Sequence, residues 1–315
     1  RDVGHGKMSP AQLEENVRLF YLRHADILIC TTIIENQHFT ENQSAIIAIQ
    51  PASNNDDSSL NEGEERTVHL DEAGTLSSLI YEDRYKIKTL IISGNLNGSD
   101  LALIHEMASS EAGQLATLDM SEASIVKGGD PYYMHYTTKD QVVGTYLFFR
   151  CFNLQTVILP NSVTTIENAA FEGSNLRTIT ISKNVTNIGT GIFSGCWYLP
   201  LLEVEEGNPN YYSEPGSNVI IERSTHRLIA GCPNSVIPEG VTTIASYALA
   251  VTLNAINLPE SLTTIEDAAF VGAQLKHLHI PKNVQKIGAN AFDADGVQGI
   301  TVDEGNTTYD SRNNL

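Results

Sequence analysis

The stretch that decides the fold is Leu154-Gln-Thr-Val157-Ile-Leu159-Pro160-Asn-Ser-Val163-Thr-Thr-Ile166-Glu-Asn-Ala-Ala170-Phe171. Its opening, Leu-x-x-Val-x-Leu, alternates at the end and predicts a short strand with one buried face. The proline that follows cannot donate to a strand ladder, so it ends the strand. The later Val, Ile, Ala and Phe return apolar side chains to the same interior. A unit of about 22 residues cannot bury its own face, which predicts that neighbouring units stack on it.

The same frame starts at residues 154, 176, 199, 232, 253, 275 and 297, in steps of 22, 23, 33, 21, 22 and 22 residues. One step is longer than the others and indicates an insertion. Inside it, Asn218-Val-Ile-Ile-Glu222 and Arg227-Leu-Ile-Ala230 flank the polar link Arg-Ser-Thr-His. Two apolar runs joined in this way predict a β-hairpin, here at about 205–231.

The frame resembles the BspA-like leucine-rich repeat of Bacteroides-type and other bacterial surface proteins and of protozoan ones. The segments 275–292 and 154–171 match its pattern most closely, and Cys151 and Cys196 stand at its terminal cysteine position. The resemblance extends over residues 147–315 in repeats of 22–23 residues. It implies a leucine-rich-repeat β-solenoid of the α/β type, mostly β, with a parallel sheet on the concave face. It also implies adhesion or recognition far more often than catalysis.

Residues 67–146 contain divergent repeats of the same kind. The segments 87–92 and 115–120 both contain the Leu-x-x-Leu-type strand, 28 residues apart, and the spacing over 99–107 predicts a helix behind an Asp or Ser cap. The stretch 127–146 is interpreted as a loop or an irregular repeat. Residues 53–66 are acidic and polar, as in a linker. Residues 1–52 predict a small α+β segment, with a capped helix and short strands, of no family that the sequence identifies.

A longer period is superimposed on the repeat. The segment Val204-Glu-Glu-Gly-Asn-Pro-Asn-Tyr211 returns as Val302-Asp-Glu-Gly-Asn-Thr-Thr-Tyr309, 98 residues later. The glycine in each copy is typical of a turn with positive φ. The end of the solenoid has no obvious cap, so either the natural chain continues or the tail folds over the last repeat.

Charge argues against a nucleic-acid partner, and hydropathy argues against a membrane-spanning segment. The chain has 19 basic and 38 acidic residues, a net charge of −19, and such a surface repels nucleic-acid phosphates. No stretch approaches the ~20 apolar residues that cross a bilayer. The chain begins at Arg1 without a leader. Together with the family resemblance, these features predict an extracellular or cell-surface location. The chain would be anchored in the outer membrane after removal of a signal segment.

The sequence contains no catalytic motif. The zinc-protease His-Glu-x-x-His, the Gly-x-Ser-x-Gly elbow, the phosphate-binding loop and the dinucleotide Gly-x-Gly-x-x-Gly are all missing, so no catalytic residue and no cofactor are expected. His277 and His279 alternate on one strand, about 7 Å apart, a spacing that can hold a metal. No third ligand is fixed beside them, so a solvated face is the preferred interpretation and no metal is expected.

The candidate binding residues are those that the frame leaves free on the outer side of each strand. They are Thr156, Ile158, Thr178, Thr180, Glu203, Asn234, Asn257, His277, His279 and Thr301. This face has no aromatic cluster, which argues against a platform for stacking sugars and favours a protein partner. The expected partner is a host extracellular-matrix protein or a protein of another cell, bound by a monomer through the concave sheet or the hairpin insertion. The alternatives are a carbohydrate-binding or scaffold module of the cell surface, outward residues that only cover the sheet, and an enzyme with its site in the N-terminal segment.

Overall fold

The computed structural model describes residues 65–311, except 252, 254, 293–296 and 298. The helix and strands expected within 1–52, and all but the last two residues of the predicted linker 53–66, lie outside the described residues. Those two residues begin β1 (Glu65–Leu70), so the predicted end of the linker is wrong by two positions. The strand starts earlier because Glu65 and Arg66 already pair in parallel with Thr89 and Leu90 of the next strand.

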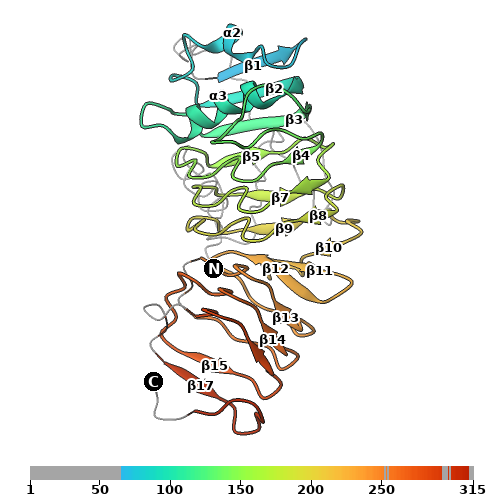
Figure 1. The fold of residues 1–315 in the computed structure, drawn as a ribbon, viewed down its shortest axis with the longest axis vertical. Helices are drawn as coiled ribbons and strands as arrows, with labels where there is room; N and C mark the ends of the chain where they lie inside the picture. The colour runs from blue at the N-terminus through green and yellow to red at the C-terminus, as the bar shows by residue number, and fades with distance from the viewer. Residues whose placement is uncertain (1–64, 252, 254, 293–296, 298, 312–315) are drawn as a thin grey trace, which may run out of the picture. The chain divides into compact units, whose positions relative to one another are not determined.

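The first strands of the repeats pair in parallel (Figure 1), except in the frames that start at 232 and 253, whose opening segments form no strand in the described residues. Strands β1, β2 (Thr89–Leu96), β3 (Thr117–Ile125) and β5 (Thr156–Ile158) pair in chain order. A bridge from Thr156 to Thr178 links β5 to β7 (Ile179–Ile181), which pairs with β9 (Leu202–Val204). Further along, β15 (Leu278–Ile280) pairs with β17 (Ile300–Val302). The predicted parallel sheet of a leucine-rich-repeat solenoid is confirmed.

Two helices belong to the divergent repeats, α2 (Leu76–Ile80) and α3 (Gly98–Ser109). The cap of α3 is Asn97, whose side-chain oxygen accepts the Ser99 N–H at 3.0 Å. The predicted Asp or Ser cap is wrong, because Asp100 acts as the third helical residue and reaches back. Its buried carboxylate accepts the backbone N–H groups of Asn97, Gly74 and Leu76, and so ties α3 to the preceding repeat.

The second half of each repeat forms a further column of two-residue strands that the sequence frame did not predict as strands. Strands β4 (Val142–Val143), β6 (Thr165–Ile166) and β8 (Asn187–Ile188) pair in parallel. Strands β13 (Thr243–Ile244), β14 (Thr264–Ile265) and β16 (Lys286–Ile287) do the same in the later repeats. Thr and Ile suit this position, because β-branched side chains favour extended backbone.

Aromatic side chains stack along the interior at the last position of the frame. Phe148, Phe171 and Phe193 are buried and form a ladder with ring centroids 5.3 and 5.5 Å apart. Phe270 and Phe292 continue the pattern in later repeats at 5.5 Å. Each ring fills the space above its neighbour, so one repeat completes the core of the next.

The predicted hairpin is confirmed: β11 (Val219–Glu222) and β12 (Arg227–Gly231) pair antiparallel, and β10 (Tyr211–Tyr212) pairs with β11. Its apolar residues alternate between two cores, since Ile220 and Ile229 belong to one hydrophobic cluster and Ile221 and Leu228 to the other. Burial on both faces explains why its sequence is continuously apolar. The expectation that the hairpin binds a partner is therefore wrong for these side chains.

The two segments of the longer period, residues 204–211 and 302–309, fold in the same way and are called plugs, because each packs against the end of the repeats that precede it. Asn208 donates to the carbonyls of Ser182 and Val185, both at 2.9 Å, and Asn306 donates in the same way to Pro281 and Val284. The Asn side-chain oxygen of each plug accepts the N–H of the tyrosine three residues later, Tyr211 or Tyr309, at 2.8 Å. The predicted positive φ is confirmed at Gly207 (87°) but wrong at Gly305, whose φ lies outside that region. The tail up to Tyr309 folds over the last repeat.

Candidate functional site

The outward residues of the first sheet lie on its solvent side, as the alternation predicts. All ten candidate residues are exposed or half-buried, whereas their neighbours Val157, Ile179, Leu202 and Leu278 are buried. The bridge and strand pairings bring Thr156, Ile158, Thr178, Thr180 and Glu203 together on β5, β7 and β9. Asn234 and Asn257 lie in segments that form no strand, so they are exposed but not held in the same register.

The histidine pair lies at the C-terminal part of this face. His279 Nδ1 is 3.1 Å from Thr301 Oγ1, and His277 Nε2 is 3.5 Å from the same oxygen. Asp303 is the nearest carboxylate, 3.9 Å from His279 Nε2. Within the described part of the chain, no group of three or more His, Cys, Asp or Glu side chains could hold a metal ion.

A Cys–His contact exists in the interior, but it lacks the chemistry of a catalytic pair. Cys151 Sγ lies 3.8 Å from His105 Nδ1, and that nitrogen also lies 2.9 Å from the Leu147 carbonyl oxygen. Burial raises the pKa of the Cys151 thiol and lowers the pKa of His105. The thiol therefore stays protonated, and a substrate cannot reach it.

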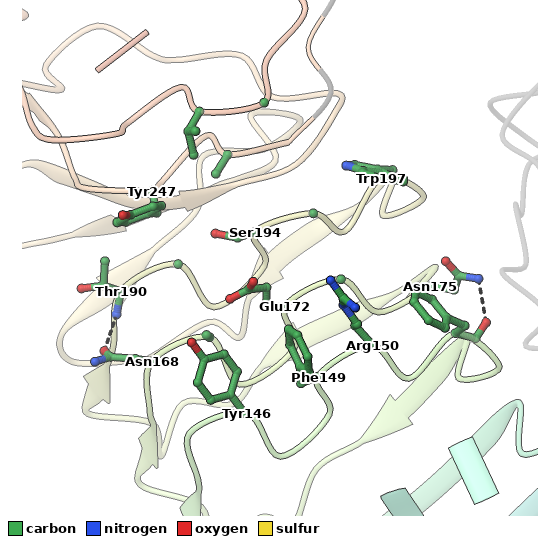
Figure 2. Close-up of a pocket in the computed structure, with 18 of the residues that line it drawn as sticks. Tyr146, Phe149, Arg150, Asn168, Glu172, Asn175, Thr190, Ser194, Trp197 and Tyr247 are labelled. Atoms are coloured by element: carbon green, nitrogen blue, oxygen red, sulfur yellow. Dashed lines mark hydrogen bonds between the residues drawn. The ribbon is translucent and has the colours of Figure 1, made fainter. Parts of the chain in front are cut away.

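A groove of about 1150 Å³ opens on another part of the surface, and sequence reasoning missed it. Its walls are the turns on either side of the stacked Phe148, Phe171 and Phe193, together with the turns at 247–250 and 271–272 (Figure 2). A hydrogen bond from the Gly195 N–H to the Ala250 carbonyl, at 2.8 Å, joins turns that are 55 residues apart in sequence. The signal in the sequence was a set of aromatic residues at turn positions outside the frame, including Trp197, the only tryptophan.

Large aromatic side chains in the groove are open to solvent. Trp197 is 62% exposed, Phe152 52%, Tyr198 49% and Tyr247 45%. The Arg177 guanidinium lies 4.8 Å from the centre of the Tyr198 ring. Tyr146 and Phe149 contact each other edge to face and join the groove to a cluster that includes Tyr133 and Tyr136.

Two oppositely charged groups lie among these rings. Figure 2 shows Arg150 and Glu172 between Tyr146 and Phe149 on one side and Tyr247 and Trp197 on the other. Burial raises the pKa of the Glu172 carboxyl, although Arg150 acts in the opposite direction.

Two amide side chains of the groove are held by hydrogen bonds to the backbone. Asn168 accepts the Thr190 N–H at 2.8 Å, and Asn175 donates to the Phe152 carbonyl at 2.6 Å. These bonds fix the two amides at the rim.

The turns of the groove use left-handed backbone at matching positions of successive repeats. Two residues before each position of the phenylalanine ladder, φ is positive whatever the residue type: Tyr146 (60°), Ala169 (53°), Gly191 (65°), Tyr247 (58°), Ala268 (53°) and Asn290 (51°). Two residues after it, Gly173 and Gly195 are left-handed at 69°, and so is Arg150 at 52°. Glycine adopts this conformation freely, while other residues are strained there by about 1–2 kcal/mol.

The family model for the BspA type leucine-rich repeat region matches six copies in this chain, at residues 134–214 and 220–313, which is more than half of its length. The chain belongs to the BspA-type leucine-rich repeat family. The match begins at 134, so the BspA-type repeats start inside the stretch interpreted as a loop or an irregular repeat. Comparison with curated proteins gives no match.

Solved structures with similarity to this BspA-type chain include a pneumococcal antigen and bacterial leucine-rich repeat proteins. The pneumococcal vaccine antigen PcpA is 19% identical, with a TM-score of 0.47, over 77% of this chain and 62% of that one. A leucine-rich repeat protein from Eubacterium ventriosum is 22% identical, with a TM-score of 0.47, over 71% and 62%. A leucine-rich cell surface protein from Faecalibacterium prausnitzii is 22% identical, with a TM-score of 0.43, over 76% and 74%. The chain thus spans about three fifths of the length of the first two proteins. No helix of the described residues is long and apolar enough to cross a membrane.

Proposed function

We propose that this BspA-type chain is a non-catalytic recognition protein that binds a protein partner through the outward face of its first sheet. The observation that carries the proposal is the exposure of Ile158, 45% accessible, in the middle of a weakly polar column of strands. Val236, 62% exposed, occupies the equivalent outward position of a later repeat. Apolar side chains exposed on a polar, ordered surface are typical of the centre of a protein interface.

The rest of the face suits this role. Thr180 and Glu203 lie beside Ile158 on neighbouring parallel strands, which hold them in a fixed register. Residues on rigid strands lose little conformational entropy on binding, so a small number of contacts can give measurable affinity. The partner class we propose is an extracellular-matrix protein or a surface protein of another cell, bound by a monomer at the bacterial surface.

The test is binding of the purified chain to immobilised extracellular-matrix proteins, measured by biolayer interferometry. Ile158→Arg should weaken the interaction at least tenfold, because a charge at the centre of an interface is buried without a partner. Gln285→Arg is the matched control, since Gln285 is exposed and precedes β16 of the other column. Equal affinities for the two variants would show that this face is not the interface. Antibody labelling of intact cells tests the proposed surface location.

A further inference from the structure

The groove described above lies on turns, away from the sheet on which the proposed function rests. We infer that it binds a neutral oligosaccharide, whose pyranose rings stack on Trp197 and Tyr247 while their hydroxyls bond to Glu172 and Arg150. This is a second site for a different class of ligand. The rings, the charges, the size and the backbone strain of the groove each support it.

The rings supply the stacking surfaces. An aromatic face is electron-rich and attracts partially positive hydrogens, and the faces of a pyranose ring present C–H groups of that kind. Trp197 and Tyr247 are both about half exposed or more and line the same groove. Large exposed aromatic surface on an otherwise polar protein indicates a ligand that covers it.

The charged groups match a ligand that is neutral and rich in hydroxyls. Glu172 accepts hydrogen bonds from hydroxyls, and Arg150 donates to them. One carboxylate and one guanidinium leave the groove nearly neutral, and the net charge of −19 opposes polyanions. A proline-rich peptide also binds between aromatic rings, but it needs apolar slots, and here Glu172 and Arg150 occupy the space between the rings.

The size favours a chain of several sugar rings. The groove is open and its volume of about 1150 Å³ exceeds the ~300–1,000 Å³ of sites that enclose a small molecule. A single monosaccharide would leave most of the aromatic surface uncovered. An oligosaccharide that lies along the turns reaches both Trp197 and Tyr247.

One strained backbone position falls on a residue that this ligand would use. Arg150 is left-handed at a position where other repeats have Gly173, Gly195 or Gly272. Glycine at this position would relieve the strain but would remove a hydrogen-bond donor. Strain that is kept at a ligand-lining position is a feature of functional sites.

The experiment uses the intrinsic fluorescence of the full chain, because Trp197 is its only tryptophan and lines the groove. Cellohexaose, maltohexaose and chitohexaose are titrated, with a proline-rich peptide as the competing ligand class. At least one oligosaccharide should give a saturable change in emission. Tyr247→Ala and Glu172→Gln should each weaken its binding at least tenfold, and calorimetry should find the same for Trp197→Ala. Tyr81→Ala is the matched control, since Tyr81 is equally exposed but lies outside the groove.

Two results would overturn the inference: no response to any of the three oligosaccharides, or a response that Tyr247→Ala and Trp197→Ala leave unchanged. A response to the peptide alone would also overturn it and would identify a peptide groove. Ile158→Arg should leave the sugar titration unchanged, and Trp197→Ala should leave matrix-protein binding unchanged. Failure of this site can therefore be separated from failure of the proposed function.

Discussion

The Tyr211 hydroxyl accepts a hydrogen bond from the backbone N–H of Ile188, at 3.0 Å, at the free edge of the sheet formed by β4, β6 and β8. Ninety-eight residues later, Tyr309 accepts the N–H of Ile287 at the same distance, at the edge formed by β16. An unpaired edge strand is prone to pair with another chain. At each edge, a tyrosine hydroxyl accepts the backbone N–H that would otherwise donate to a further strand.

Tyr211→Phe should lower the free energy of unfolding by about 1–2 kcal/mol, because it leaves the part-buried Ile188 amide without its acceptor. Chemical denaturation of the purified chain measures the change. Tyr212→Phe is the control: within the described residues its hydroxyl makes no hydrogen bond, although its ring lies under Arg223. Equal destabilisation by both variants would count against an edge-capping role.

Phe270→Ala should lower the free energy of unfolding by about 3–5 kcal/mol, because it empties a fully buried site that stacks on Phe292. Glu260→Ala should change it very little, because that side chain is exposed and its ion pair with Lys282, at 3.8 Å, is a surface one. Thermal unfolding compares the two. Similar shifts would contradict the assignment of inward and outward positions.

Glu266→Gln should lower stability at pH 7 by about 2 kcal/mol, because Arg227 loses an ionised partner with which it forms two hydrogen bonds, at 2.9 and 2.7 Å. The Arg227 guanidinium holds the pKa of Glu266 below its ordinary value, against the opposing effect of burial. A lowered pKa in the folded state stabilises above the unfolded-state pKa, and the contribution is lost as the pH falls through the folded-state pKa.

The difference between wild type and Glu266→Gln should therefore shrink as the pH falls below 4.5, the ordinary value. Denaturation midpoints from pH 7 to pH 3 test this, with the exposed Glu304→Gln as control. A difference that stays constant over this range would mean that the charge of Glu266 contributes nothing.

Cys151, Cys196 and Cys232 should resist iodoacetamide in the native chain and react fully after denaturation without reductant. All three are buried and unbridged, and burial raises the pKa of Cys196 to about 12. The thiolate is the reactive form, so little of it exists at pH 8. Mass spectrometry counts the labelled thiols. A bridged Cys151–Cys196 peptide would contradict the repeat register, which separates these residues by two strands.

The sequence predicted the burial pattern of the first sheet, because the alternation in Leu-x-x-Ile-x-Ile sets which side chains are buried. Among the described residues, the strand itself does not form in the frames that start at 232 and 253. It did not predict the second column, because a pair such as Thr165 and Ile166 is too short to alternate. The hairpin was predicted as an element, but its apolar side chains lie in the core, which leaves only its turn at 223–226 exposed to a partner. The continuous apolar run of the hairpin indicated burial on both faces. The repeat frame did not show that the hairpin lies between two hydrophobic clusters.

The groove could not be derived from the frame. Its aromatic residues lie at turn positions, where the repeat leaves the residue type free. The contact that closes it, from Gly195 to Ala250, depends on how the inserted hairpin brings two distant turns together. The aromatic residues at turn positions outside the frame, Trp197 among them, were the signal available before the structure.

The two plugs have a consequence for how this kind of chain evolves. Because each plug finishes the sheet that precedes it, the segment between Tyr211 and Tyr309 begins beside one completed edge and ends on another. A recombination event that duplicates or deletes this whole segment would join one completed edge to another and expose no unpaired strand. Loss of a single repeat within it would instead misalign a plug and its sheet. Natural length variants should therefore differ by whole segments more often than by single repeats.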